Sequence, residues 1–464
     1  MAQVDLAAGR SDRACTGIGL GLRILQSAGL HRRDAYTSLM NSDEIEEHKR
    51  IAWSFFMLDR HYNASRTYSL ALADKHFTLP FPSSIRIGAE GFLNIGILHY
   101  RPGIAANSID QGILSCLIRL SSIWGKATEY IFEPLEATAQ PPWQSGTALA
   151  VLESDWLQFQ THFADAHRYM NVDFRRRARE EPSSRAYLST WLCVQFLFHS
   201  LQGFLHHPFV VSSKLRAVEG NIPSTFLQKC YESSLIHSRW IARFVREMTE
   251  VDMRLQDPFI GYLCAIAATI QLEHTVGNNQ KVSRLAKKDY RILVDYVIGM
   301  SAQWENMRVL VYNLPSTRLN ELSFRRRKYG SLYENQEQFS GILPRMPTST
   351  ELPRMSAEDE ALMWDILDFN SSCSFAQAFS LGGLTSHNRI AGSQVLDQGE
   401  HAPPTQDQQA TFVQPFSIQG MSSLFETAMD PSPDAFLPDG DDPGLSLSDT
   451  TDWLLFRGYL GEQL

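Results

Sequence analysis

The sequence predicts an all-α protein, an irregular multi-helix array that is followed by a largely disordered acidic tail. Apolar residues recur at helical spacing through most of residues 13–330. No run of residues alternates apolar and polar side chains between turn signals, as a strand would. The composition changes at about residue 331. We therefore divide the 464 residues into a disordered start at 1–12, a helical domain at 13–330 and a tail at 331–464.

The helical patterns follow one another along the chain. The first predicted helix begins at about Arg13 and ends at Gly29, which suits a left-handed C-cap. The second begins near Asp43, where Asn41, Ser42 and Asp43 offer cap oxygens, and runs to about Tyr62. Further helical patterns cover about residues 113–124, 149–163, 191–205, 226–248, 258–267 and 282–314. No repeat of fixed period is present, so a regular solenoid is not predicted.

The second helix carries Asp59 and Arg60 among apolar residues, which indicates a buried helix with an internal ion pair. The order of residues around it adds a second observation. The relevant segments are Gly29-Leu30-His31-Arg32-Arg33, Lys49-Arg50-Ile51-Ala52-Trp53, Leu58-Asp59-Arg60 and Leu79-Pro80. This ordered set resembles the middle homology region of fungal zinc-cluster transcription factors.

The resemblance covers about residues 13–82. The chain departs from the family's pattern at Ala52, where an aromatic residue is usual, and at residues 66–68, where Gly-Arg-Pro is common. The resemblance implies a helical regulatory domain in which the motif positions are architectural. Those positions are His31, Trp53, Asp59, Arg60 and Pro80.

The family's DNA-binding module needs six clustered cysteines, because two zinc ions share bridging thiolates. Here the six cysteines lie 34 to 109 positions apart, with no Cys-x-x-Cys pair. We expect buried free thiols and no cofactor in this chain, since zinc belongs to an N-terminal module that is absent here. DNA contact is then expected only indirectly, through the missing module or a partner.

The tail differs from the body in charge. Residues 331–464 contain 20 acidic and 4 basic residues, a net charge of −16, whereas the remainder has a net charge of +7. Three acidic-aromatic islands interrupt this tail, and they suit short activation segments that enter a coactivator groove. The alternative is that the islands dock back on the body, and for Trp364 both remain open. The candidate activation anchors are Trp364, Leu367, Phe369, Leu424, Phe425, Trp453, Leu454, Leu455 and Phe456.

Basic clusters offer a second signal. Arg325, Arg326, Arg327 and Lys328 form either a solvated helix end or a nuclear-import signal. A similar arginine cluster lies at residues 175–179. The most apolar run, residues 187–211, is interrupted by polar residues and a proline, so no membrane span is expected.

Catalytic signatures are not found: there is no nucleophile elbow, phosphate-binding loop or His-Glu-x-x-His motif. Glu46-Glu47-His48 and His206-His207 fit helix ends better than metal sites. We expect a fungal nuclear transcription regulator, an activator rather than an enzyme. Its expected partners are the coactivator machinery and possible homo- or heterodimer subunits. The alternatives are a helical interaction scaffold or truncated co-regulator without DNA binding, and an unrecognised helical enzyme with a polar-lined pocket.

Overall fold

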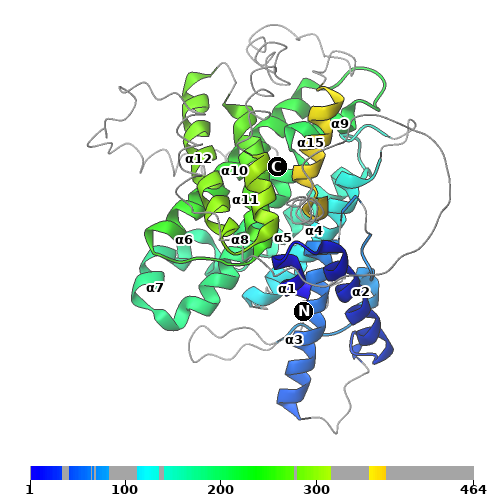
Figure 1. The fold of residues 1–464 in the computed structure, drawn as a ribbon. Helices are drawn as coiled ribbons and strands as arrows, with labels where there is room; N and C mark the ends of the chain where they lie inside the picture. The colour runs from blue at the N-terminus through cyan, green and yellow to red at the C-terminus, as the bar shows by residue number, and fades with distance from the viewer. Residues whose placement is uncertain are drawn as a thin grey trace, which may run out of the picture. The chain divides into compact units, whose positions relative to one another are not determined.

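The computed structural model describes residues 2–33, 41–63, 65–66, 69–82, 112–134, 140–275, 279–314 and 355–371. These residues form helices and connecting segments without a β-strand, which confirms the all-α prediction for this part of the chain (Figure 1). All of them belong to one compact unit that extends to Arg389. None of the described helices is long and apolar enough to cross a membrane.

The first half of the unit contains α1 (Ala2–Ala7), α2 (Ser11–Ser27), α3 (Ser42–Leu58), α4 (Ile113–Phe132), α5 (Ala148–His162), α6 (Tyr169–Val172) and α7 (Phe174–Glu180). The second half contains α8 (Arg185–Leu205), α9 (Pro208–Leu215), α10 (Ser224–Glu250), α11 (Pro258–His274), α12 (Gln280–Ser301), α13 (Glu305–Asn313) and α15 (Ala357–Leu367). Short 3₁₀ turns lie between α3 and α4, on both sides of the α6–α7 pair, and a π-helical turn follows α3.

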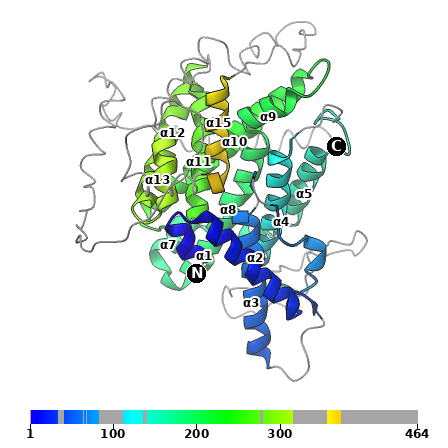
Figure 2. The same cartoon turned by 45° about the vertical axis from the view of Figure 1, so that its right-hand side comes forward.

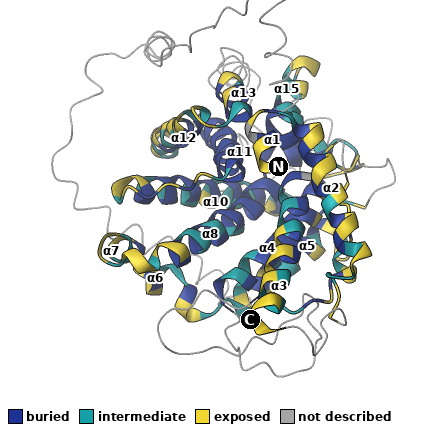
Figure 3. Ribbon diagram, turned by 60° about the horizontal axis from the view of Figure 1, so that its bottom comes forward, coloured by how far each residue is buried: buried dark blue, intermediate teal, exposed yellow. Residues whose placement is uncertain are grey.

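Helix α11 is the centre of the unit. It is mainly apolar around its circumference, and every one of its residues is buried, including the polar residues of its C-terminal part (Figure 3). It begins where the Asp257 side chain accepts a hydrogen bond from the Phe259 amide, with Pro258 at the first helical position. Helices α8, α10, α12 and α13 pack against it. The helix predicted at 258–267 is therefore present and continues to His274.

Helices α2 and α3 pack together through a glycine. A Cβ atom at Gly21 would lie 2.2 Å from Phe55 Cε1, so only glycine lets the aromatic ring of α3 approach this closely. Gly29 has φ 72°, which confirms the left-handed helix end. At the start of α3, Asn41 and Glu44 form a reciprocal capping box, with hydrogen bonds of 2.8 and 3.1 Å.

Two predictions differ from the structure. Residues 1–12 were expected to be disordered, but Ala2–Ala7 form α1, whose Leu6 is fully buried. Six residues are too few to show a helical period, and tertiary packing stabilises them. The single helix predicted at 282–314 is broken at residues 302–304, so that α13 folds back onto α11. The fold-back is possible because Gly261 of α11 leaves room for the sulfur atoms of Met300 and Met307.

Candidate functional site

The Asp59–Arg60 pair lies in the π-helical turn Asp59–Asn63 that follows α3. Both side chains are fully buried, and Arg60 Nη1 donates a 2.5 Å hydrogen bond to Asp59 Oδ2. Arg60 Nη2 also donates to Asp74 Oδ1 and to the Leu72 carbonyl, each at 2.6 Å. Asp59 Oδ1 accepts a hydrogen bond from the Ala71 amide at 3.1 Å. The pair therefore ties the end of α3 to the extended segment that follows it.

The surroundings of Arg60 compensate the cost of burying its charge. Its guanidinium carbon lies 4.1 Å from the centre of the Phe56 ring, a cation–π contact. Helix α4 approaches the Arg60 stem at Gly125, where a Cβ atom would lie 2.6 Å from Arg60 Cδ. A buried ion pair stabilises a fold only when its polar atoms have further partners, and here both members do.

The other motif positions meet in one aromatic layer. Trp53 Nε1 donates a 3.1 Å hydrogen bond to the Pro80 carbonyl, and the Trp53 ring stacks on Phe77 at 5.3 Å. His31 contacts the edge of Phe77 at 6.3 Å, and its carbonyl accepts a hydrogen bond from the Thr78 amide at 3.1 Å. The contacts of His31, Trp53 and Pro80 thus hold the extended segment against α2 and α3. These three residues therefore have a structural role.

Helix α15 comes from the segment assigned to the tail, and it lies along the helical body (Figure 2). The ring of Trp364 contacts Phe209 of α9 at 4.9 Å and Phe132 of α4 at 6.1 Å. The guanidinium of Arg66 lies 5.6 Å from the same ring. At the start of the helix, Glu360 forms a 2.6 Å ion pair with Arg216.

The residues at the end of α15 are buried. Phe369 is 2% exposed and lies between the rings of Tyr62 and Tyr262, at 5.0 and 5.3 Å. The Tyr262 hydroxyl donates a hydrogen bond to the carbonyl of Leu367, which is fully buried. Asn370 Nδ2 donates to the Tyr62 carbonyl at 2.8 Å. This first island therefore docks on the body, which is the second of the two arrangements that the sequence left open.

The remaining predicted site residues lie outside the described residues. These are Arg325, Arg326, Arg327, Lys328, Leu424, Phe425, Trp453, Leu454, Leu455 and Phe456. Their roles in nuclear import and activation stay predictions.

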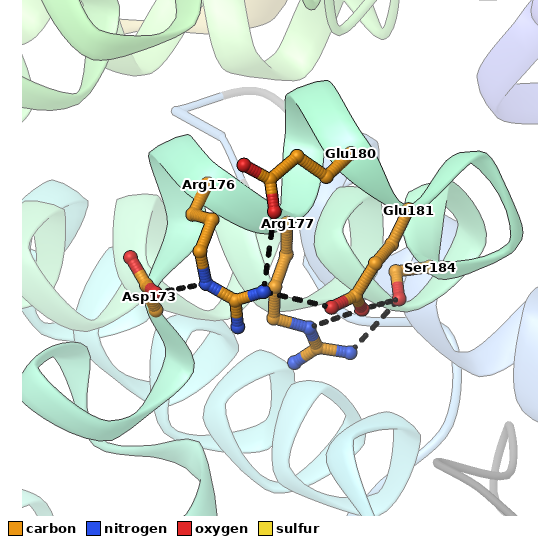
Figure 4. A network of polar contacts seen from close by, with 6 residues as sticks. All are labelled: Asp173, Arg176, Arg177, Glu180, Glu181 and Ser184. Carbon is orange, nitrogen blue, oxygen red and sulfur yellow. Dashed lines mark hydrogen bonds and ion pairs between the residues drawn. The ribbon is translucent and has the colours of Figure 1, made fainter.

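The arginine cluster of α7 is paired with acidic neighbours (Figure 4). Arg176 donates to Asp173 at 2.6 Å and to Glu180 and Glu181 at 3.4 and 3.3 Å. Arg177 donates to Glu181 at 3.0 Å, and Ser184 joins the same network. A signal for an acidic receptor needs available cations, so this pairing favours a structural role for the cluster.

His206 and His207, which were predicted to end a helix, lie between the end of α8 and the start of α9. His207 Nδ1 accepts a 3.1 Å hydrogen bond from the Phe209 amide and caps α9. His206 Nε2 lies 2.9 Å from Glu153 Oε1, and Lys229 Nζ lies 2.6 Å from Glu153 Oε2. Among the described residues, no group of three or more His, Cys, Asp or Glu side chains could hold a metal ion.

One pair of polar residues was not predicted. The Tyr62 hydroxyl donates a hydrogen bond to Asp257 Oδ1, although 195 positions separate the two residues. Both line a cavity between the motif helices and the start of α11. The sequence showed Asp257-Pro258 as a helix start and Tyr62 as a core position, but a single sequence contains no signal that would bring the two together.

The helical fold and its buried motif define an all-α domain in which the motif residues serve packing. Residues 5–162 match the family model of the fungal specific transcription factor domain, which confirms the resemblance. The match ends at the last residue of α5, and the helices from α6 onward lie beyond it. Searches of curated proteins and of solved structures gave no match.

Proposed function

We propose that the protein is a nuclear regulator of transcription that acts by protein contact and has no catalytic activity of its own. The match of residues 5–162 to the fungal specific transcription factor domain carries this proposal. The buried Asp59–Arg60 pair and the Trp53–Pro80 contact support it, because they are the positions on which the family resemblance rests.

The acidic tail is the proposed activating element. Its net charge of −16 favours an open chain in water, and its apolar islands are suited to enter a partner's groove as short helices. Because the island at Trp364 packs on the body, we assign activation to the islands around Phe425 and Trp453. Burial of each anchor side chain would contribute about 1.5–3 kcal/mol to the binding free energy, and ordering of the tail would offset part of it. Coactivator binding would therefore be weak and transient.

DNA contact is proposed to come from a separate zinc-cluster module or from a partner subunit, in a homo- or heterodimer. The proposed nuclear-import signal is the basic cluster Arg325–Lys328. Replacing these four residues by alanine should shift a fluorescent fusion of the chain from the nucleus to the cytoplasm. The matched control replaces Arg175, Arg176, Arg177 and Arg179, and should leave the fusion nuclear.

A reporter assay tests the activating role. Residues 372–464, which begin after the docked island, are fused to a heterologous DNA-binding domain beside the full chain in the same fusion. We expect activation from both, and loss of most of it when Phe425 and Trp453 are replaced by alanine. The control is Phe416→Ala, an aromatic residue of the same tail outside the islands. Activation that survives the loss of Trp364, Phe425 and Trp453 together would refute the assignment.

The second candidate is a helical interaction scaffold, derived from such a regulator but without an activating tail. One observation favours it: the first acidic-aromatic island serves as a packing element of the body. A scaffold would give no reporter signal from either fusion, whereas it would still form complexes with other proteins through the body.

A further inference from the structure

A cavity of about 560 Å³ lies where the motif helices meet the second half of the bundle. Its walls come from α1, α2, α3, the π-helical turn, α4, α8 and the start of α11. Most of the lining is apolar, including Phe55, Leu117, Leu197 and Ile260. Cavities of about 300–1,000 Å³ with apolar walls and a few placed polar groups are typical of small-molecule sites.

The first polar group in the cavity is the carboxylate of Asp257. Its Oδ1 accepts hydrogen bonds from the Tyr62 hydroxyl and, at 2.9 Å, from the Phe259 amide. None of the lining residues is a lysine or an arginine. The carboxylate therefore presents acceptor lone pairs to the cavity without a neighbouring cation in its wall. Burial raises the pKa of Asp257, and the hydrogen bonds from Tyr62 and Phe259 oppose that shift.

The second polar group is the imidazole of His61, which stacks on the Phe259 ring at 4.1 Å. His61 Nε2 lies 2.9 Å from Ser121 Oγ, and that hydroxyl donates its own hydrogen to the Leu117 carbonyl at 2.8 Å. Ser121 can then only accept from His61, so Nε2 carries the ring hydrogen and Nδ1 keeps its lone pair. Burial and the nearby Arg60 charge lower the pKa of His61 to about 3, so the ring stays neutral.

We propose that this cavity binds an uncharged, mainly apolar small molecule whose hydroxyl group donates a hydrogen bond to Asp257 or His61. Asp257 and His61 are both acceptors, so they favour a ligand that donates. Gln3 and Ser54 also line the cavity, but their side chains can donate or accept and therefore do not discriminate. An anionic ligand would lose its hydration in a cavity whose lining offers no cation, so the cavity disfavours it.

The imidazole of His61 and the thiol of Cys193 are unsuited to catalysis. A general acid or base works best with a pKa near the operating pH, whereas the pKa of His61 is lowered to about 3. Burial raises the pKa of the Cys193 thiol, which also lines the cavity, to about 12. A thiol in that state is a poor nucleophile. Neither group is therefore suited to act in a reaction, and the mainly apolar lining favours binding.

A matched set of fluorescent probes tests the proposal on the full chain. The probes are 1-pyrenemethanol, 1-methylpyrene and 1-pyrenecarboxylate, which share one apolar ring system. The first carries a hydroxyl donor, the second has no hydrogen-bonding group, and the third carries a negative charge. We expect saturable one-to-one binding of 1-pyrenemethanol. It should bind about tenfold more tightly than 1-methylpyrene, as one hydrogen bond to a charged acceptor predicts. The carboxylate should not bind.

Two glycines of α2 provide matched variants. Gly17 lines the cavity, Gly19 does not, and a Cβ atom at either position meets no atom within 4 Å, so both leucine variants should fold. Gly17→Leu should weaken 1-pyrenemethanol binding at least tenfold, and Gly19→Leu should leave it unchanged. Asp257→Asn keeps an N-cap side chain but replaces one acceptor by an amide donor. It should abolish the preference for the alcohol over 1-methylpyrene, while circular dichroism confirms an intact fold.

Absence of binding, or equal binding of the alcohol and 1-methylpyrene to the unaltered chain, would overturn the proposal. Equal binding to the two leucine variants would also overturn it, because the probe would then lie elsewhere. The measurement is direct binding, so its failure leaves the proposed role in transcription untouched. Failure of the reporter assay would likewise leave the cavity's binding unchanged.

Discussion

Replacing Arg60 by methionine would remove the positive charge from the buried cluster while keeping most of the side-chain volume. The Asp59 carboxylate would remain in the interior without a cation, and the Leu72 carbonyl would lose a 2.6 Å hydrogen bond. Removing one partner of a buried ion pair typically costs about 3–5 kcal/mol, because the remaining charge is uncompensated. We expect the free energy of unfolding to fall by about that amount.

The matched control is Arg50→Met on α3, the helix that leads into the π-helical turn. Arg50 Nε lies 3.1 Å from Glu46 Oε1, but the Arg50 side chain is 46% exposed, and exposed pairs contribute about 0–1 kcal/mol. Urea unfolding followed by tryptophan fluorescence measures both losses, since Trp53 lies in the layer beside the pair. Adding Asp59→Asn to the Arg60→Met chain should recover part of the loss. Equal losses in the two single variants would refute the idea that this pair holds the turn.

Three further perturbations test other parts of the unit. Gly261→Ala would place a Cβ atom 2.6 Å from a methionine sulfur and should lower the free energy of unfolding by about 1–3 kcal/mol, whereas Gly203→Ala, with its nearest atom at 3.4 Å, should not destabilise. Phe369→Ala should lower the free energy of unfolding by about 3–5 kcal/mol and make α15 sensitive to protease. Equally fast cleavage within α15 of the unaltered chain would show that the helix is not docked. Burial alone would raise the pKa of Glu153, but the hydrogen bonds and charges of His206 and Lys229 outweigh it and lower that pKa from 4.5 to about 2. Its stabilisation, ~3 kcal/mol, is complete above pH 4.5 and is lost as the pH falls toward 2, so in Glu153→Gln the acid-induced loss measured by urea unfolding should shrink.

The sequence predicted most helices because their apolar faces are long enough to show a period. The pattern could not place the break at residues 302–304, since no proline or glycine lies there and the break depends on space beside Gly261. It also left open whether Trp364 docks on the body. That outcome depends on aromatic partners in α4 and α9, far away in the sequence.

The motif residues were predictable as a set, but their contacts were not. Arg60 and Asp59 are adjacent in the sequence, so an ion pair was expected, whereas the role of Asp74 as a second acceptor emerges only from the structure. The cavity was not predicted at all. Its polar groups, His61 and Asp257, come from distant elements, and each taken alone resembles an ordinary core residue.

The carbonyl oxygen of Tyr62 accepts hydrogen bonds from two distant parts of the chain, Cys15 Sγ at 3.7 Å and Asn370 Nδ2 at 2.8 Å. During synthesis, the ribosome must release residue 370 before this junction can close. Until then, the apolar surface around Tyr62 that Phe369 later covers would remain exposed to water. A nascent chain arrested before that point would be a natural client for chaperones.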